Sequence, residues 1–132
     1  MQIPIRVYIE DTDAGGIVYY VNYLKFMERA RTEYMRHLGY GKAAFFADQL
    51  MIVVHSLNVS YCKPAHLDDS LMVSAEPVKV GKVAVVFEQK VYLDDQLLCL
   101  GEVKVACVRR KDQKPAALPT LMYQQLRQRL RQ

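Results

Sequence analysis

The sequence lacks several features that would assign it to a special class of protein. No apolar run approaches the ~18 residues that a membrane-spanning helix needs, so no transmembrane segment is expected. Residues 1–4 show no charged segment followed by an apolar one, and we therefore expect no signal peptide. No repeat, low-complexity stretch or linker interrupts the chain, so its 132 residues predict one domain, 1–132.

Cysteine and histidine are too few and too scattered for a disulfide framework or a metal centre. The three cysteines, an odd number, lie in apolar, strand-like stretches: Cys62, Cys99 and Cys107. This pattern predicts buried free thiols in a reducing compartment, and hence a cytoplasmic protein. The three histidines lack the spacing of metal ligands, and no Ser-His-Asp order indicates a serine hydrolase. We expect no metal.

The excess of positive charge is mild. The formal net charge is +4 and the pI is about 9.0, which suits an anionic ligand but is too small to indicate nucleic-acid binding. Lysines and arginines gather around two loops, one with Lys63, Lys79 and Lys82 and one over residues 109–114. Such a rim could hold phosphate groups, although a solvated charged face would look the same in sequence.

Periodicity predicts an α+β domain. Apolar residues recur at helical spacing over 22–38, with Arg31 among the polar residues of the opposite face, and Gly39 is a plausible stop. Alternating apolar residues predict a half-buried strand over 2–10, and Pro77 suggests an edge or a bulge. Further strands are expected over 51–61, 71–80, 82–93 and 97–109, and further helices over 41–50 and 120–132. This order favours one long helix packed against a curved antiparallel sheet.

Residues 10–23 bring together the groups that attack on a carbonyl would use. The first strand runs into two carboxylates, Asp11 and Asp13, and two glycines follow before the long helix begins. A helix start offers unpaired N–H groups and a partial positive charge. A carboxylate beside such donors could attack or activate water, while the donors hold the developing oxyanion. Asp11 has the propensity to bond loop N–H groups instead.

Several segments carry a family resemblance. They read YIEDTDAGGIVY (8–19), NY (22–23), FMERARTE (26–33), VSYCKPAHLDD (59–69) and KPAALP (114–119). Spread over nearly the whole chain, they resemble the hotdog-fold acyl-CoA thioesterases of the 4-hydroxybenzoyl-CoA thioesterase family. Within that family the chain is most similar to the Tol-Pal-associated, YbgC-type branch.

The resemblance implies a hotdog fold, with a long helix wrapped by a sheet, in a homodimer or homotetramer whose active sites lie at the dimer interface. It implies that Asp13 is the catalytic carboxylate, acting as nucleophile or as general base. The thioester oxygen would be held by a backbone N–H near Tyr20. Because that branch often has His where this chain has Tyr20, only the backbone role is carried over.

Other residues are candidates for substrate contact. The flexible Gly16 would let the backbone approach the ligand. Tyr23 lies on the apolar stripe of the helix and would line the acyl pocket or simply pack in the core. His55 lies on a strand that faces the substrate in the family, although a lone histidine is more often structural. The full set of expected substrate-binding residues is Gly16, Val18, Tyr19, Tyr23, His55, Lys63 and Lys82.

The sequence thus predicts an acyl-CoA thioesterase that releases a free acid and coenzyme A. Coenzyme A is part of the substrate, and no further cofactor is expected. The alternative is a module that binds an acyl chain or an acyl carrier protein with little turnover, in envelope or phospholipid assembly. A hotdog dehydratase is a weaker option, because the His–carboxylate pair that it needs is not visible.

Overall fold

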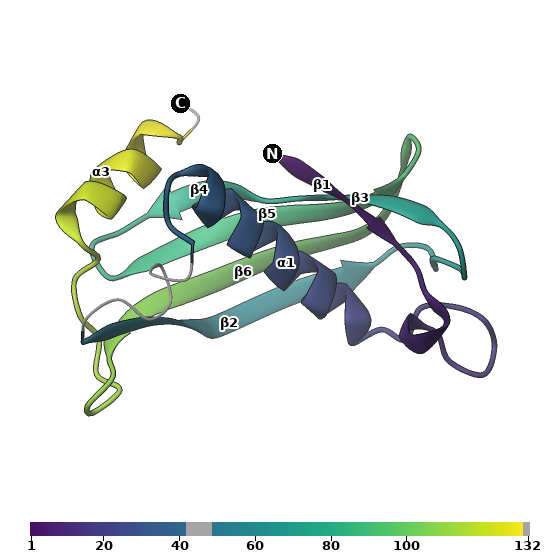
Figure 1. The fold of residues 1–132 in the computed structure, drawn as a ribbon, viewed down its shortest axis with the longest axis horizontal. Coiled ribbons are helices and arrows are strands. Elements are labelled where there is room, and N and C mark those ends of the chain that lie inside the picture. Colours follow the sequence, from purple (N-terminus) through teal and green to yellow (C-terminus); the bar gives the residue numbers. More distant parts are fainter. Residues whose placement is uncertain (42–48, 131–132) are drawn as a thin grey trace.

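A computed structural model describes residues 1–41 and 49–130 and has a six-stranded antiparallel sheet with a long helix lying across it (Figure 1). The long helix is α1 (Asn22–His37), and a second helix, α3 (Thr120–Gln128), packs against the β4 end of the sheet. The strands are β1 (Gln2–Arg6), β2 (Leu50–Tyr61), β3 (Ser70–Ser74), β4 (Glu76–Val80), β5 (Ala84–Leu93) and β6 (Gln96–Arg109). Their order is β1-β3-β5-β6-β2, with β4 also pairing β5. This is the predicted α+β hotdog architecture. No described helix is long and apolar enough to span a membrane.

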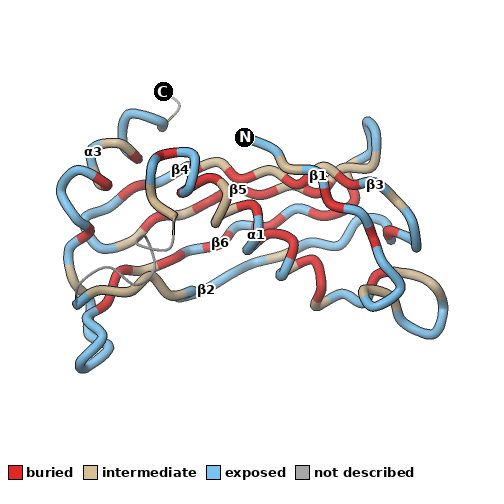
Figure 2. Tube along the Cα trace, in the orientation of Figure 1, coloured by how far each residue is buried: buried red, intermediate tan, exposed pale blue. Residues whose placement is uncertain are grey.

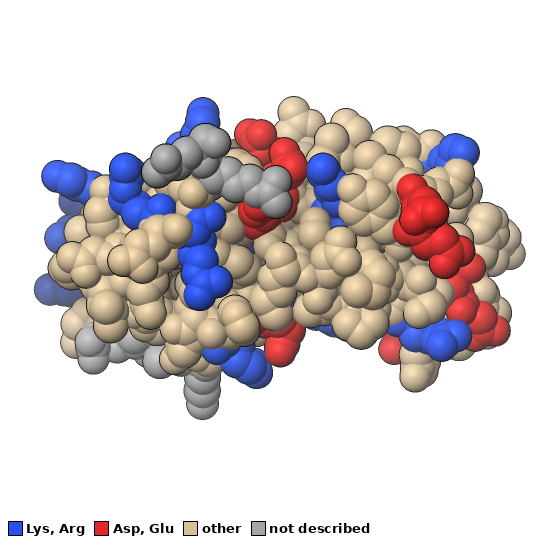
Figure 3. Space-filling model, turned by 90° about the horizontal axis from the view of Figure 1, so that it is seen from above, with Lys and Arg blue, Asp and Glu red and all other residues tan. Residues whose placement is uncertain are grey.

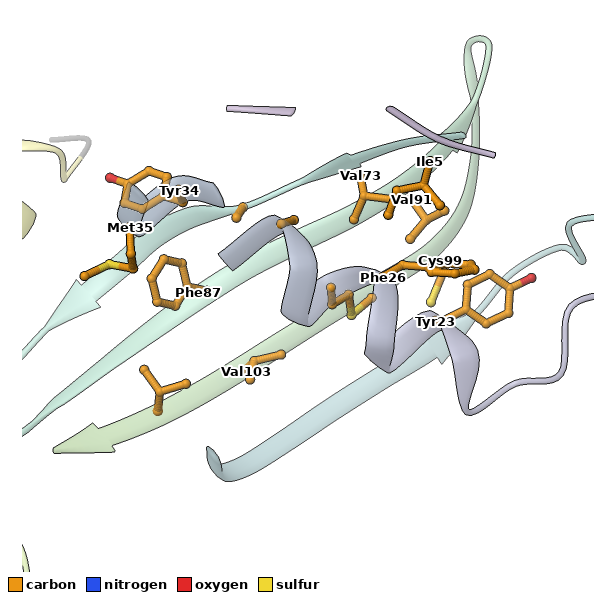
Figure 4. Packing of buried hydrophobic residues seen from close by; sticks show 14 of the residues in the cluster. Ile5, Tyr23, Phe26, Tyr34, Met35, Val73, Phe87, Val91, Cys99 and Val103 are labelled. Carbon is orange, nitrogen blue, oxygen red and sulfur yellow. The ribbon is translucent and has the colours of Figure 1, made fainter. Parts of the chain in front are cut away.

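The core lies between α1 and the concave face of the sheet. Buried positions recur along α1 and alternate along β5 and β6 (Figure 2). Phe26 and Met27 of α1 are fully buried, and Tyr34 packs edge-on against Phe87 of β5 (Figure 4). Each buried side chain of this kind stabilises the fold by about 1.5–3 kcal/mol. The apolar stripe of α1 therefore fixes the helix on the sheet.

A glycine lets α1 approach β6 closely. A Cβ added at Gly101 would lie 2.8 Å from the Met27 sulfur, so Met27 would have to move. We expect Gly101→Ala to lower the free energy of unfolding by about 1–3 kcal/mol, measured by urea denaturation. Gly81→Ala is the matched control, because its new carbon would come no closer than 3.5 Å to the Ala84 oxygen. Equal midpoints for the two variants would contradict this packing.

The structure corrects some element boundaries. The predicted strand over 2–10 ends at Arg6, and a short 3-10 helix (Ile9–Asp11) follows. The predicted strand over 71–80 is two strands that separate at Ala75, and the register shift between Pro77 and Lys79 confirms the expected bulge. The helix predicted over 41–50 falls mostly on residues 42–48, outside the described residues, and β2 has already begun at Leu50.

The prediction of buried thiols is confirmed for Cys99 and Cys107 and wrong for Cys62, which is exposed because β2 ends one residue before it.

Burial, with a smaller effect of Cys62, raises the pKa of the Cys99 thiol from 9.0 to about 12. A raised folded-state pKa contributes stability that is complete below pH 9 and is lost as the pH rises toward 12. We expect the free energy of unfolding, measured by denaturant titration at a series of pH values, to fall across that range. In Cys99→Ala this decrease with pH should be smaller. An equal decrease in wild type and variant would contradict the assignment.

Candidate active site

The loop between β1 and α1 holds Asp13 in a tight turn. The Asp13 N–H donates to the Ile17 carbonyl (2.9 Å), and the Gly16 N–H donates to the Asp13 carbonyl (3.1 Å). Gly16 has a φ of 80°, a backbone conformation that favours glycine. The Gly15 N–H donates to Oδ1 of Asp13 (2.8 Å), while Oδ2 takes no hydrogen bond from the described residues. One oxygen orients the exposed carboxylate, and the other is open for chemistry.

Asp11 has a different role in the same loop. Its Oδ2 accepts the Tyr8 N–H (2.9 Å), as expected for a carboxylate that bonds loop N–H groups. Its backbone carbonyl accepts the Tyr19 N–H (3.0 Å) and the side-chain amide of Asn22 (2.8 Å). These bonds tie the loop to the first residue of α1, so Asp11 stabilises the conformation that presents Asp13.

The start of α1 presents open hydrogen-bond donors. The Asn22 N–H donates to the Tyr19 carbonyl (2.8 Å), whereas the N–H groups of Tyr20 and Val21 find no acceptor among the described residues. No side chain caps this helix end. Unpaired N–H groups at a helix N-terminus carry partial positive charge and stabilise a nearby anion. They are suited to hold an oxyanion if a carbonyl oxygen is placed against them.

An apolar groove opens beside this helix start. Its volume is about 320 Å³, and the Tyr61 hydroxyl at its wall donates to the Tyr20 carbonyl (3.2 Å). The buried Tyr23 accepts the Ala65 N–H on its hydroxyl oxygen (2.9 Å), and desolvation raises the pKa of its phenol. The lining residues are Ile17, Val18, Tyr20, Tyr23, Tyr61, Cys62, Lys63 and Pro64.

This groove brings together four of the predicted site residues: Val18, Tyr20, Tyr23 and Lys63. It also contains Tyr61, which the sequence reasoning missed. The ring of Tyr61 lies 5.5 Å from that of Tyr23 and 6.0 Å from that of Tyr20, so it closes one side of the groove. The signal was present, because Tyr61 belongs to the segment VSYCKPAHLDD that carried the family resemblance.

The other predicted residues, Asp13 among them, lie outside the groove lining. Gly16 is in the neighbouring loop, where its carbonyl accepts the Leu67 N–H (3.3 Å), and the exposed Tyr19 ring stacks at a tilt 5.0 Å from Tyr20. His55 is exposed at the β2 bulge, with Nδ1 3.4 Å from the Ser56 hydroxyl. The structure leaves their contact with substrate as a prediction.

Lys82 is far from the groove within one chain. It precedes Ala84, which pairs with Ala106, whereas Tyr61 at the groove pairs with Cys99. The seven residue steps from Cys99 to Ala106 along β6 span about 23 Å at the usual rise of a strand. Lys82 and Asp13 therefore lie at opposite ends of the sheet.

The β2 edge of the sheet is open. β2 pairs with β6 on one side, and no described strand pairs with its other side. On its concave face Val54, Leu57 and Tyr61 are 49%, 46% and 47% exposed. A long strand with an open edge and exposed apolar side chains is typical of a surface that another chain covers.

Charge is distributed unevenly along the molecule. Lys and Arg gather at the α3 end of the face seen in Figure 3, whereas Asp and Glu gather toward the end that carries the Asp13 loop. Within the described ranges, no three His, Cys, Asp or Glu side chains converge as ligands of a metal ion would. The expected absence of a metal stays a prediction.

Comparison with known proteins identifies a family and several relatives that this chain resembles. Residues 15–100 match the sequence profile of the Thioesterase superfamily. The Acyl-CoA thioesterase YbgC of Haemophilus influenzae is 47% identical over 88% of this chain and 86% of its own length. The Acyl-CoA thioester hydrolase YbgC of Escherichia coli is 41% identical over 95% and 94%. The crystal structure of a probable thioesterase from Bartonella henselae is 28% identical, with a TM-score of 0.83 over 90% of this chain and 98% of that one.

Proposed function

The chain belongs to the Thioesterase superfamily, and from this premise we propose that it is an acyl-CoA thioesterase that uses Asp13 and the start of α1. The observation that carries the proposal is the juxtaposition of three features. An exposed carboxylate with one free oxygen lies in a loop that leads directly into unpaired helix N–H groups. Beside the helix start is an apolar groove walled by tyrosine rings, which suits an acyl group, and the carbonyl of its lining residue Ile17 accepts the Asp13 N–H.

The reaction has two forms that these groups could support. In one, Asp13 attacks the thioester carbon, the C–S bond breaks, and coenzyme A leaves as a thiolate that takes a proton. Water then hydrolyses the mixed anhydride to the free acid and regenerates the carboxylate. In the other, Asp13 takes a proton from water as the water attacks the thioester carbon, the C–S bond breaks, and the proton passes to the leaving coenzyme A thiolate. In both, the Tyr20 and Val21 N–H groups stabilise the negative charge on the carbonyl oxygen.

The site is completed by a second copy of the chain, joined edge to edge through β2. An antiparallel β2 pair is isologous and places the beginning of one strand beside the end of the other. The α3 end of the partner, rich in Lys and Arg, then lies near the Asp13 end of this protomer. Lys63 of one protomer and the partner subunit's Lys82 would share the phosphates of coenzyme A. The acidic Asp13 end has few cations of its own for this purpose.

An acyl carrier protein is a second substrate carrier that the charge distribution favours. The basic α3 end of the molecule complements an acidic carrier, and a carrier-bound acyl group presents the same thioester. A module that only binds such carriers is the competing function. The cytoplasmic location expected from the sequence remains a prediction.

Product analysis tests the proposed function. Purified protein is incubated with short, long and aromatic acyl-CoAs, and free thiol and free acid are quantified together. Equal amounts of thiol and acid, formed catalytically, are the expected result. Tight binding of acyl-CoA or of an acyl carrier protein without release of acid from any substrate would overturn the enzyme in favour of the binding module.

A further inference from the structure

Three hollows follow one another along the seam between α1 and β2. The first is the groove at Tyr20 and Tyr61. The second, of about 260 Å³, extends from Val21, just before α1, to Arg31 and is walled on the β2 side by Leu57 and Val54. The third is a small apolar cavity of about 30 Å³ beneath α3, and its β2 wall is Ile52. An acyl chain entering at the groove would therefore run along α1 toward α3.

Among the described residues, Arg31 alone lines both the second and the third hollow. It lies nine residues beyond the start of α1, which is about 14 Å along the helix axis. Periodicity assigned Arg31 to the solvent face, but its side chain turns inward, and its guanidinium donates to the Gln89 Oε1 atom (2.9 Å). Burial lowers the pKa of Arg31 without neutralising a guanidinium.

Gln89 holds this guanidinium rigidly. It is fully buried on the concave face of β5, and its amide donates to the Met27 carbonyl (2.8 Å) and the Ser74 carbonyl (3.2 Å). Its carbonyl oxygen is therefore pointed at Arg31 by two bonds to the backbone. The cation lies at a fixed point between the second hollow, whose walls also carry Lys25 and Glu28, and the apolar cavity beneath α3.

We propose that Arg31 ends the acyl-binding groove and limits the length of the acyl chain that the enzyme accepts, an inference that rests on the proposed thioesterase function. A chain that stops short of Arg31 buries its methylenes against Leu57, Val54 and Val103. A longer chain would have to push aside a hydrogen-bonded cation or place methylenes against it. Both would remove polar interactions that the apolar chain cannot replace. The cavity behind Arg31 is too small to admit a chain unless this side chain is removed.

The test is the chain-length profile of Arg31 variants. Wild type, Arg31→Ala and Arg31→Met are assayed on saturated acyl-CoAs from acetyl to palmitoyl, and kcat/KM is determined for each. The methionine variant keeps an unbranched side chain of similar length without the charge, so it remains informative if the alanine variant does not fold. Arg36→Ala is the matched control, since Arg36 is an exposed arginine of the same helix that lines none of the three hollows.

We expect both Arg31 variants to raise the ratio of long-chain to short-chain kcat/KM by about tenfold or more, the effect of methylenes gaining burial. Arg36→Ala should keep the wild-type ratio. Folded Arg31 variants that hydrolyse short chains with an unchanged ratio would overturn the role of Arg31 and leave the thioesterase intact. If the wild type hydrolysed no acyl-CoA of any chain length in an Asp13-dependent way, both proposals would be overturned.

Discussion

Replacing Asp13 with asparagine should lower kcat for acyl-CoA hydrolysis by about 10²–10⁴-fold, the usual worth of a positioned catalytic carboxylate. The fold should be unchanged, because the Asn side-chain oxygen can still accept the Gly15 N–H that now bonds Oδ1 of Asp13. Only the charge and the basicity of the free oxygen are lost. Thiol release at saturating substrate, with thermal unfolding alongside, measures both effects.

Asp11→Asn is the matched control for that variant. It makes the same chemical change two residues away, at a carboxylate whose Oδ2 already accepts the Tyr8 N–H. We expect its kcat to stay within a few-fold of wild type. If Asp11→Asn lost as much activity as Asp13→Asn, the loop as a whole would matter and Asp13 would have no special role.

Mixing two inactive variants should restore activity if the site is shared between protomers. Lys82→Glu should lower kcat/KM by about tenfold to a hundredfold, the worth of a charged hydrogen bond to phosphate. When Asp13→Asn and Lys82→Glu chains are unfolded and refolded together, half of the dimers are mixed. Each mixed dimer has one intact site, so activity should recover to about a quarter of wild type.

A double variant provides the control for the mixing experiment. Chains carrying both Asp13→Asn and Lys82→Glu, mixed with Asp13→Asn, contain no Asp13 and should regain nothing. Native mass spectrometry shows whether mixed dimers form. Mixed dimers without recovered activity would mean that Lys82 does not serve the partner's site. Its place at the opposite end of β6 from the groove would then exclude it from the site of its own chain as well.

Sequence periodicity predicted those parts of the fold that are determined by the burial of apolar side chains alone. The apolar stripe of α1 has no alternative to burial, so its bounds and its packing against the sheet could be predicted from spacing. The split at Ala75 could not, because an apolar alternation continues through it and only the pairing of β3 and β4 with β5 separates the strands. Cys62 likewise is exposed only because β2 ends at Tyr61.

The candidate site was predictable where it is local in sequence. Asp13, Tyr20 and Tyr23 all lie in residues 13–23, where the loop leads into α1; the resemblance implied Asp13 and Tyr20, and the apolar stripe indicated Tyr23. Tyr61 and Arg31 were missed because their roles depend on long-range contacts. Tyr61 reaches Tyr20 across 41 residues, and Arg31 reaches Gln89 across 58. A helical wheel shows where a Cβ points but not where a long, flexible arginine ends.

The most direct test of the account is thiol release from an acyl-CoA series by wild type and Asp13→Asn proteins assayed side by side. The account predicts catalytic turnover by the wild type on at least one chain length, and a loss of at least about a hundredfold in the folded variant. Equal rates in the two proteins, or no turnover by either, would contradict it.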